Sequence, residues 1–204
     1  MKKLVKSLIY YIISAIGISL TIKAGIGVSS FNSLNVSLSN LISIKVGTIT
    51  SMINLVFMIG CIILDKNRKK SKYALMAFAT ISFGGVINIV YYYFFTPIHL
   101  ASYPMQLIVF ILGVALAGAG TGQVVRINLL TFPIEFFCQI LVSQTPYSFS
   151  TFRYGVDIIC VSLSLFISLF FSLPIVVREG TVLSLCLLSG IISWSKSISL
   201  KKEK

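Results

Sequence analysis

Six long apolar runs constrain this chain more than any other feature of its sequence. Each run is long enough, or nearly so, to cross a bilayer, which takes about 20 residues in a helix. The runs cover residues 5–23, 47–64, 73–95, 104–122, 149–172 and 180–196. The last run is short for a straight span. The pattern predicts an all-α polytopic membrane protein with about six transmembrane helices.

The composition agrees with a lipid environment. Hydrophobic residues make up 56% of the 204 positions and charged residues only 11%, whereas a soluble domain carries about 25% charged residues. Because so little polar material cannot coat a soluble globule, we expect lipid to cover most of the outside. We therefore expect a single membrane domain over residues 1–204, with the lipid bilayer as its first partner.

The basic residues are distributed as in a membrane protein. The net charge of +12 would suggest nucleic-acid binding in a soluble chain, but here the basic residues cluster at the chain ends and in the loop 65–72. These clusters alternate with apolar runs, as the positive-inside rule of membrane proteins requires. We expect no nucleic-acid partner.

Two further segments are helical in character but poor membrane spans. Residues 29–43 are rich in serine and asparagine, and residues 127–144 carry Pro133, Glu135 and Gln139. Segments of this kind are tolerated at membrane depth only where protein or water covers them. We therefore predict two half-helices, or re-entrant segments, instead of two more spans.

The two half-helices belong to an internal repeat with an offset of 103 residues. Residues 30–60 align with residues 133–163, and polar positions coincide inside apolar surroundings, as where Asn54 meets Asp157. Chance similarity between apolar segments is the alternative explanation. We favour the repeat because internal repeats are common in transporter folds.

The repeat and the charges together predict a topology. The halves cover residues 1–95 and 104–196, and a basic tail follows at 197–204. Since each half has three spans, an odd number, the second half is inserted upside down, which makes an inverted-topology repeat. Eight spans would place the loop 65–72 outside, against the orientation rule. With six spans, that loop, both termini and the basic tail face the cytoplasm.

Glycine-rich turns and Gly-Thr helix openings recur along the chain. They stand in GIGVSSFNSLNVSLS (25–39), VGTITSMINLVFMIG (46–60), PIEFF (133–137), STFRYGVDIICV (150–161) and EGTVLSLCLLSGII (179–192). These segments resemble the YczE/YyaS/YitT family, whose usual pattern includes a Ser-Pro-aromatic-Asp-x-Leu stretch. The chain departs from it with Ser30 at the proline position and Asn32 at the aspartate position. The resemblance implies an uncharacterised, transporter-like, multi-pass protein of a bacterial plasma membrane.

Three ionisable residues within apolar segments are candidates for function, because such groups are costly inside a membrane. Arg153 and Asp157 are four residues apart, which places them on one helix face within pairing distance. Glu135, on the preceding half-helix, is placed to reach the same pocket. Their repeat partners are Thr50, Asn54 and Asn32, in that order. We expect all six to converge near the midplane as a substrate or proton pathway; the alternative is an Arg153–Asp157 pair with a purely structural role.

The preferred function is a small secondary transporter or permease for a small polar or ionic solute, with Glu135 binding a cation or a proton. The main alternative is a non-transporting membrane partner that assists the assembly or localisation of another complex. A transporter needs a water-accessible polar cavity ending at Glu135, whereas an assembly partner needs a dry, well-packed centre. A homodimer is compatible with a chain this short.

An intramembrane enzyme is disfavoured. His99 is the only histidine, so a Ser-His arrangement or a histidine metal site has too few residues, and the four cysteines stand alone without metal-ligand spacing. We therefore expect no catalytic residue, no cofactor and no metal.

Overall fold

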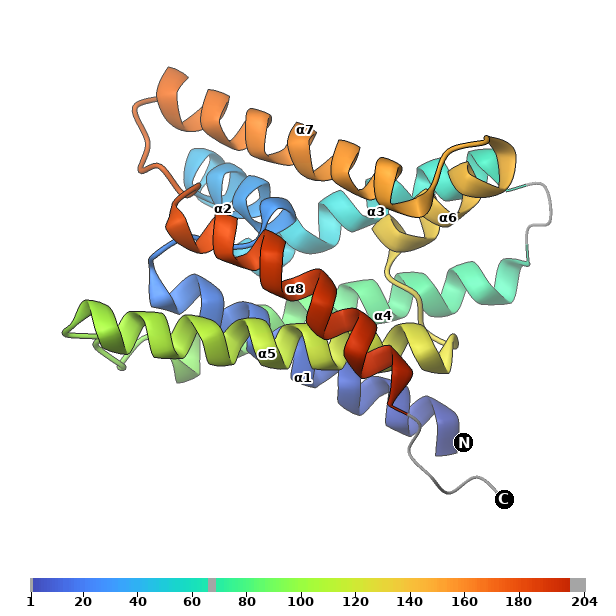
Figure 1. Cartoon of the computed structure of the whole chain (residues 1–204), viewed down its shortest axis with the longest axis horizontal. Helices are drawn as coiled ribbons and strands as arrows, with labels where there is room; N and C mark the ends of the chain where they lie inside the picture. The colour runs from blue at the N-terminus through green and yellow to red at the C-terminus, as the bar shows by residue number, and fades with distance from the viewer. Residues whose placement is uncertain (1, 66–68, 199–204) are drawn as a thin grey trace.

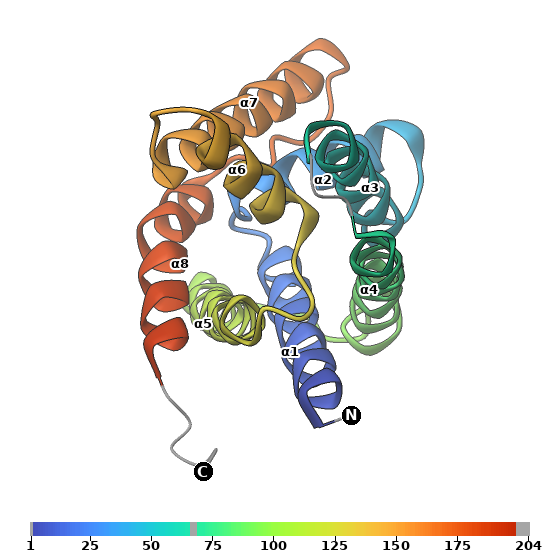
Figure 2. The same cartoon turned by 90° about the vertical axis from the view of Figure 1, so that its right-hand side faces the viewer.

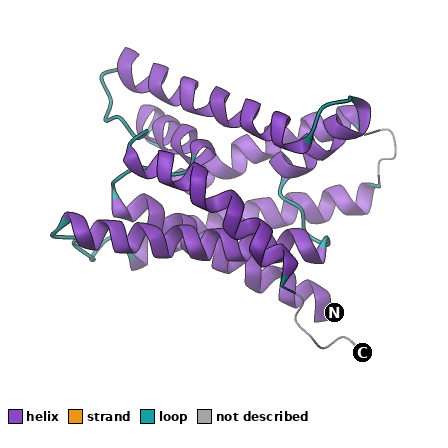
Figure 3. Ribbon diagram, in the orientation of Figure 1, coloured by secondary structure: helices purple, strands orange, loops and turns teal. Residues whose placement is uncertain are grey.

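The part of the chain that the structure describes, residues 2–65 and 69–198 of a computed structural model, is built from helices joined by short loops (Figures 1 and 3). The centre of the loop predicted at 65–72 and most of the tail predicted at 197–204 lie outside the described residues. The elements are α1 (Lys2–Ala24), α2 (Ser30–Ile42), α3 (Val46–Leu64), α4 (Lys70–Ile89), the π-helical turn η1 (Val90–Phe94), α5 (Tyr103–Ile127), α6 (Pro133–Gln144), α7 (Phe149–Phe170) and α8 (Glu179–Ser197).

Five helices are long and apolar enough to cross a membrane, which indicates an integral membrane protein of the all-α class. They are Lys3–Ala24, Val46–Leu64, Lys70–Phe94, Tyr103–Ile127 and Phe149–Phe170. The sixth predicted span, 180–196, does form helix α8, but α8 is not among the five. Its first residue is Glu179, and Lys196 lies in its last turn. The count of six spans stays a prediction.

The start of α6 differs from the prediction, which placed one helical segment over residues 127–144. Helix α5 instead continues to Ile127, and Asn128 ends it in the left-handed conformation, at φ 51°. Helix α6 then begins at Pro133. Proline suits the first position of a helix because a backbone N–H at that position would have no acceptor within the helix. The second half-helix is therefore only 12 residues long.

The two short helices run toward opposite ends of the bundle (Figure 1). The residues after α2 meet η1, which continues α4, and the Lys45 ammonium lies 5.5 Å from the centre of the Tyr92 ring. Helix α6 ends beside the end of α3, where Gln144 Nε2 donates to the Leu64 carbonyl at 2.8 Å. Since α3 runs from one of these ends to the other, the first turns of α2 and α6 lie toward the interior.

Helices α1 and α5 form the largest helix–helix interface and lie side by side in antiparallel directions (Figure 2). A Cβ on Gly17 would lie 2.6 Å from the Gly113 carbonyl oxygen and would also meet the backbone of Ala117. A Cβ on Gly120 would lie 2.7 Å from the backbone N of Ser14. Small residues permit this approach of two backbones, which stabilises helix pairs in membranes.

A cluster of three aromatic rings fixes the segment that leads into α6. Tyr11 of α1 stacks on Phe132 with ring centroids 4.4 Å apart, and Phe83 of α4 meets both rings edge-on. All three side chains are buried. Because Phe132 directly precedes Pro133, this cluster holds the first turn of α6, and with it Glu135, against α1 and α4.

Candidate functional site

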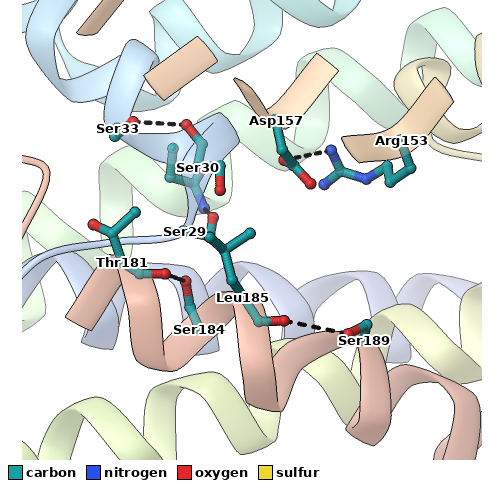
Figure 4. A network of polar contacts seen from close by, with 10 residues as sticks. Ser29, Ser30, Ser33, Arg153, Asp157, Thr181, Ser184, Leu185 and Ser189 are labelled. Carbon is teal, nitrogen blue, oxygen red and sulfur yellow. Dashed lines mark hydrogen bonds and ion pairs between the residues drawn. The ribbon is translucent and has the colours of Figure 1, made fainter. Parts of the chain in front are cut away.

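The first three turns of α7 carry an ion pair. Nη1 of Arg153 lies 2.7 Å from Oδ1 of Asp157, and the two side chains are only 24% and 13% exposed (Figure 4). Ser148 caps the helix by accepting a hydrogen bond from the backbone N–H of Thr151. The pairing predicted from the four-residue spacing is thus confirmed.

Glu135 lies in the first turn of α6, next to this pair. Its charged neighbours are Arg153 and Asp157, and its carboxylate also interacts with its own backbone N–H. Within the described residues, its buried Oε2 atom has no hydrogen-bond partner. A buried carboxylate oxygen without a donor is costly unless a proton or a cation meets it. The N-terminal parts of α6 and α7 therefore bring the three predicted charged residues into one neighbourhood.

The three predicted neutral residues lie in a second network, between α2 and α3. Nδ2 of Asn35 lies within hydrogen-bond distance of Asn32 Oδ1, at 3.3 Å, and of Thr50 Oγ1, at 3.1 Å. Nδ2 of Asn54 donates to the Thr50 carbonyl at 2.9 Å. Asn35 thus connects Asn32 and Thr50, two of the residues that the predicted repeat aligns with the charged ones.

Asn35 is a member of this network that the sequence did not lead us to predict. It stands three positions after Asn32 on the buried face of α2, and the helical spacing alone could have found it. The predicted repeat could not have found Asn35, because an offset of 103 aligns it with Cys138, which is not a polar partner.

The two networks are neighbours because α2 packs on α7. The hydroxyls of Ser37 and Ser164 lie 2.8 Å apart and join the two helices. In Figure 4 the first turn of α2 faces the Arg153–Asp157 pair. Among the described residues, no hydrogen bond or ion pair connects the neutral network to the charged one. The six candidates therefore occupy two adjacent networks.

Helix α8 borders the same region from the other side (Figure 4). The N–H of Gly180 donates to the Ile26 carbonyl at 2.9 Å, and a Cβ on Gly27 would lie 2.9 Å from the backbone N of Thr181. Gly27 also has a φ of 117°, which disfavours other residues. The turn before α2 is thus held against the start of α8.

We expect neutralising Asp157 alone to destabilise the protein more than neutralising both members of the pair. Asp157→Asn leaves the largely buried Arg153 guanidinium without a counter-charge, which costs about 3–5 kcal/mol, whereas removing both partners of a buried pair is often nearly neutral. Thermal unfolding midpoints of the purified single variants and of the double variant Arg153→Gln/Asp157→Asn measure this difference.

The control is a second ion pair, between Arg178 and Glu179, whose atoms lie 3.5 Å apart with side chains 49% and 43% exposed. Glu179→Gln should change stability by less than about 1 kcal/mol, because solvent screens an exposed pair. Equal and additive losses for the two α7 variants would contradict a coupled pair.

Comparisons with known proteins identify relatives but no activity. A family of unknown function, DUF6198, matches residues 1–197. The uncharacterized protein YyaS of Bacillus subtilis (strain 168) is 30% identical over 178 residues, which cover 86% of this chain and 83% of that protein. No solved structure shows significant similarity.

Proposed function

The chain belongs to DUF6198, a family of unknown function, and we propose that it is a small secondary transporter or permease of the plasma membrane that carries a small polar or ionic solute. The observation that carries the proposal is the Glu135 carboxylate, which has a buried oxygen without a partner beside the Arg153–Asp157 pair. An ionisable group of this kind inside a membrane protein marks a substrate or proton path.

In the proposed mechanism, Glu135 exchanges a proton or a cation as the site opens to one side of the membrane and then to the other. The Arg153–Asp157 pair keeps the adjacent wall polar without adding net charge. Asn32, Thr50 and Asn54 supply neutral hydrogen-bonding groups from the first half. The proposed protein is not an enzyme and needs no cofactor, and its partners are the bilayer and the solute; dimerisation of this short chain is compatible with the proposal.

The proposal includes membership of the YczE/YyaS/YitT group that the motifs resemble, and an inverted-topology repeat of the halves 1–95 and 104–196, which is the plan of many secondary transporters. The crossing of α1 and α5 supports the repeat. Adding 103 to Gly17 gives Gly120, and adding 103 to Ser14 gives Ala117, so the contact of Gly17 with Ala117 has its counterpart in that of Gly120 with Ser14. A two-fold axis that exchanges antiparallel helices lies perpendicular to them, hence in the membrane plane.

The proposed topology predicts which loops can be labelled. In a variant without the four native cysteines, Ser71→Cys at the start of α4 should react with an impermeant maleimide only after the cells are permeabilised. His99→Cys, between η1 and α5, is the matched control and should react in intact cells. Labelling of the Ser71 variant in intact cells would contradict cytoplasmic termini.

Reconstitution into liposomes tests the proposed function. Purified protein should take up one or more radiolabelled solutes from a panel of small acids, amines and amino acids faster than protein-free liposomes. Uptake should rise when an inward proton gradient is imposed. The assembly-partner alternative predicts no uptake of any solute by folded protein, together with recovery of a stoichiometric membrane partner from cells.

A further inference from the structure

The first turn of α2 is buried, yet it lacks a cap. Ser29 occupies the cap position, but its side-chain oxygen accepts from Asn32 Nδ2 at 2.9 Å instead of bonding a backbone N–H of the helix. Within the described residues, no acceptor meets the N–H groups of Ser30, Phe31 and Asn32. These N–H groups concentrate the positive end of the helix dipole, and a buried end normally finds partners for them.

A second observation at this end points to a ligand. Ser30 is only 2% exposed, and within the described chain its hydroxyl has no hydrogen-bond partner. Because the Cα–Cβ bond of a helical residue tilts toward the N-terminus, this hydroxyl lies at the open end of α2. A buried hydroxyl in a well-packed protein is normally paired. The end of α2 therefore presents an unused hydroxyl together with unused N–H donors.

Arg153 supplies further donors on the facing helix. Helices α2 and α7 run in the same direction, with Ser37 beside Ser164. Seven positions earlier on each helix stand Ser30 and Asp157, and Figure 4 shows them facing each other with Arg153 beyond. Of the five N–H donors of the Arg153 guanidinium, one is bonded to Asp157, and no other has a partner in the described part of the chain.

The proposed repeat allows the start of α2 to be compared with the start of α6, where an acidic side chain is present. At the start of α6, the carboxylate of Glu135 lies in the first turn of its own helix and interacts with its backbone N–H. The equivalent position in α2 is Asn32, which is neutral and turned toward Ser29. The chain thus places an anionic group at one half-helix and leaves the corresponding place at the other without one.

We propose that the open end of α2 and Arg153 together bind a small carboxylate anion. The inference rests on the proposed function in that this anion is the transported solute, accompanied by the proton on Glu135. A planar carboxylate fits the Arg fork in a bidentate manner, and the helix end and the Ser30 hydroxyl hold the same group from the other side. The Arg153–Asp157 pair is neutral as a unit, so the positive end of α2 balances the incoming charge. An anion that moves with one proton crosses without net charge.

Sodium acetate is the probe for this site. Thermal unfolding of the detergent-purified protein is followed while acetate replaces chloride at constant ionic strength. A ligand that binds only the folded state stabilises it in proportion to the logarithm of its concentration above Kd, so the midpoint should rise as acetate increases. An equal effect of sodium nitrate, or no change with acetate, would overturn the carboxylate site.

Three variants localise the effect. Asn32→Asp places a carboxylate where α6 has Glu135, so it should raise the midpoint without acetate and remove the response to acetate. Ser30→Ala should keep the fold and weaken the response about tenfold, since it deletes a donor to a charged group. Ser33→Ala is the matched control, because its hydroxyl is equally buried but already donates to the Ser30 carbonyl at 2.7 Å.

The outcomes separate this inference from the proposed function. Acetate binding with these variant effects but without any uptake in liposomes would sustain the site and contradict transport. Uptake of a cationic or neutral solute without an acetate response would support transport and contradict the carboxylate site. An unchanged acetate response in Asn32→Asp would show that the anion binds elsewhere.

Discussion

Replacing Gly17 by alanine is expected to remove most of the folded protein. The new Cβ would meet the backbone of Ala117 and would lie 2.6 Å from the Gly113 carbonyl oxygen. Neither obstacle is a flexible side chain, so α1 and α5 have to move apart along their whole interface. Overpacking of a tight interface typically costs about 1–3 kcal/mol, and we expect a loss of about 3 kcal/mol or more because both obstacles are backbone. Size-exclusion profiles and unfolding midpoints of the purified variant measure the loss.

Gly85→Ala is the control, since a Cβ on Gly85 of α4 meets nothing within 4 Å. It should be neutral or slightly stabilising, because alanine is the better helix former by about 1 kcal/mol. Gly120→Ala should be as damaging as Gly17→Ala if the two halves are equivalent. A Gly17 variant as stable as the Gly85 variant would show that the interface tolerates a methyl group.

Replacing Glu135 by glutamine is expected to abolish proton-driven uptake while leaving the protein folded. Glutamine has nearly the same shape and suits a site where one carboxylate oxygen has no partner, but it can neither release a proton nor balance a cation. Uptake in liposomes is therefore expected to fall to the background of protein-free vesicles. Uptake is expressed per folded molecule, with the folded fraction taken from size-exclusion profiles.

Glu179→Gln is the matched control, the same change at an exposed carboxylate in the first turn of α8. It should leave uptake per folded molecule unchanged. If Glu135 only serves the N–H groups of its own helix, Glu135→Gln will be a mild stability variant with normal uptake per folded molecule. That result would remove Glu135 from the proposed pathway.

The sequence predicts the helices well because lipid demands long apolar segments, and such segments are visible without a structure. The predicted run 149–172 is found as a helix over Phe149–Phe170, and the predicted segment 29–43 as a helix over Ser30–Ile42. The predicted start of α6 at residue 127 was wrong, because hydropathy does not change at Pro133 whereas backbone geometry does. The turn η1 was not predicted for a similar reason. A π-helical turn alters the hydrogen bonding of an apolar run without altering its composition.

The charged residues of the candidate site were predictable on their own, whereas the neutral Asn32, Thr50 and Asn54 were predicted only as their partners in the proposed repeat. Arg153 and Asp157 are conspicuous in an apolar helix, and their spacing predicts their contact. The open end of α2 was not predictable in this way, because serine at a helix start normally indicates a capped end. That Ser29 accepts from Asn32 and leaves the end open depends on side-chain orientation, which no local pattern encodes.

The pairing of α2 with α7 has a consequence for synthesis in the cell. Ser37 and its partner Ser164 are 127 positions apart in the chain. At a translation rate of about 5–20 residues per second, roughly 6–25 seconds pass between their emergence from the ribosome. During that time α2, with its row of buried serines and asparagines, has been made but its covering helix has not. The insertion machinery must therefore hold the first half in a shielded or interfacial state, and the polar interior closes only after the second half has entered the membrane.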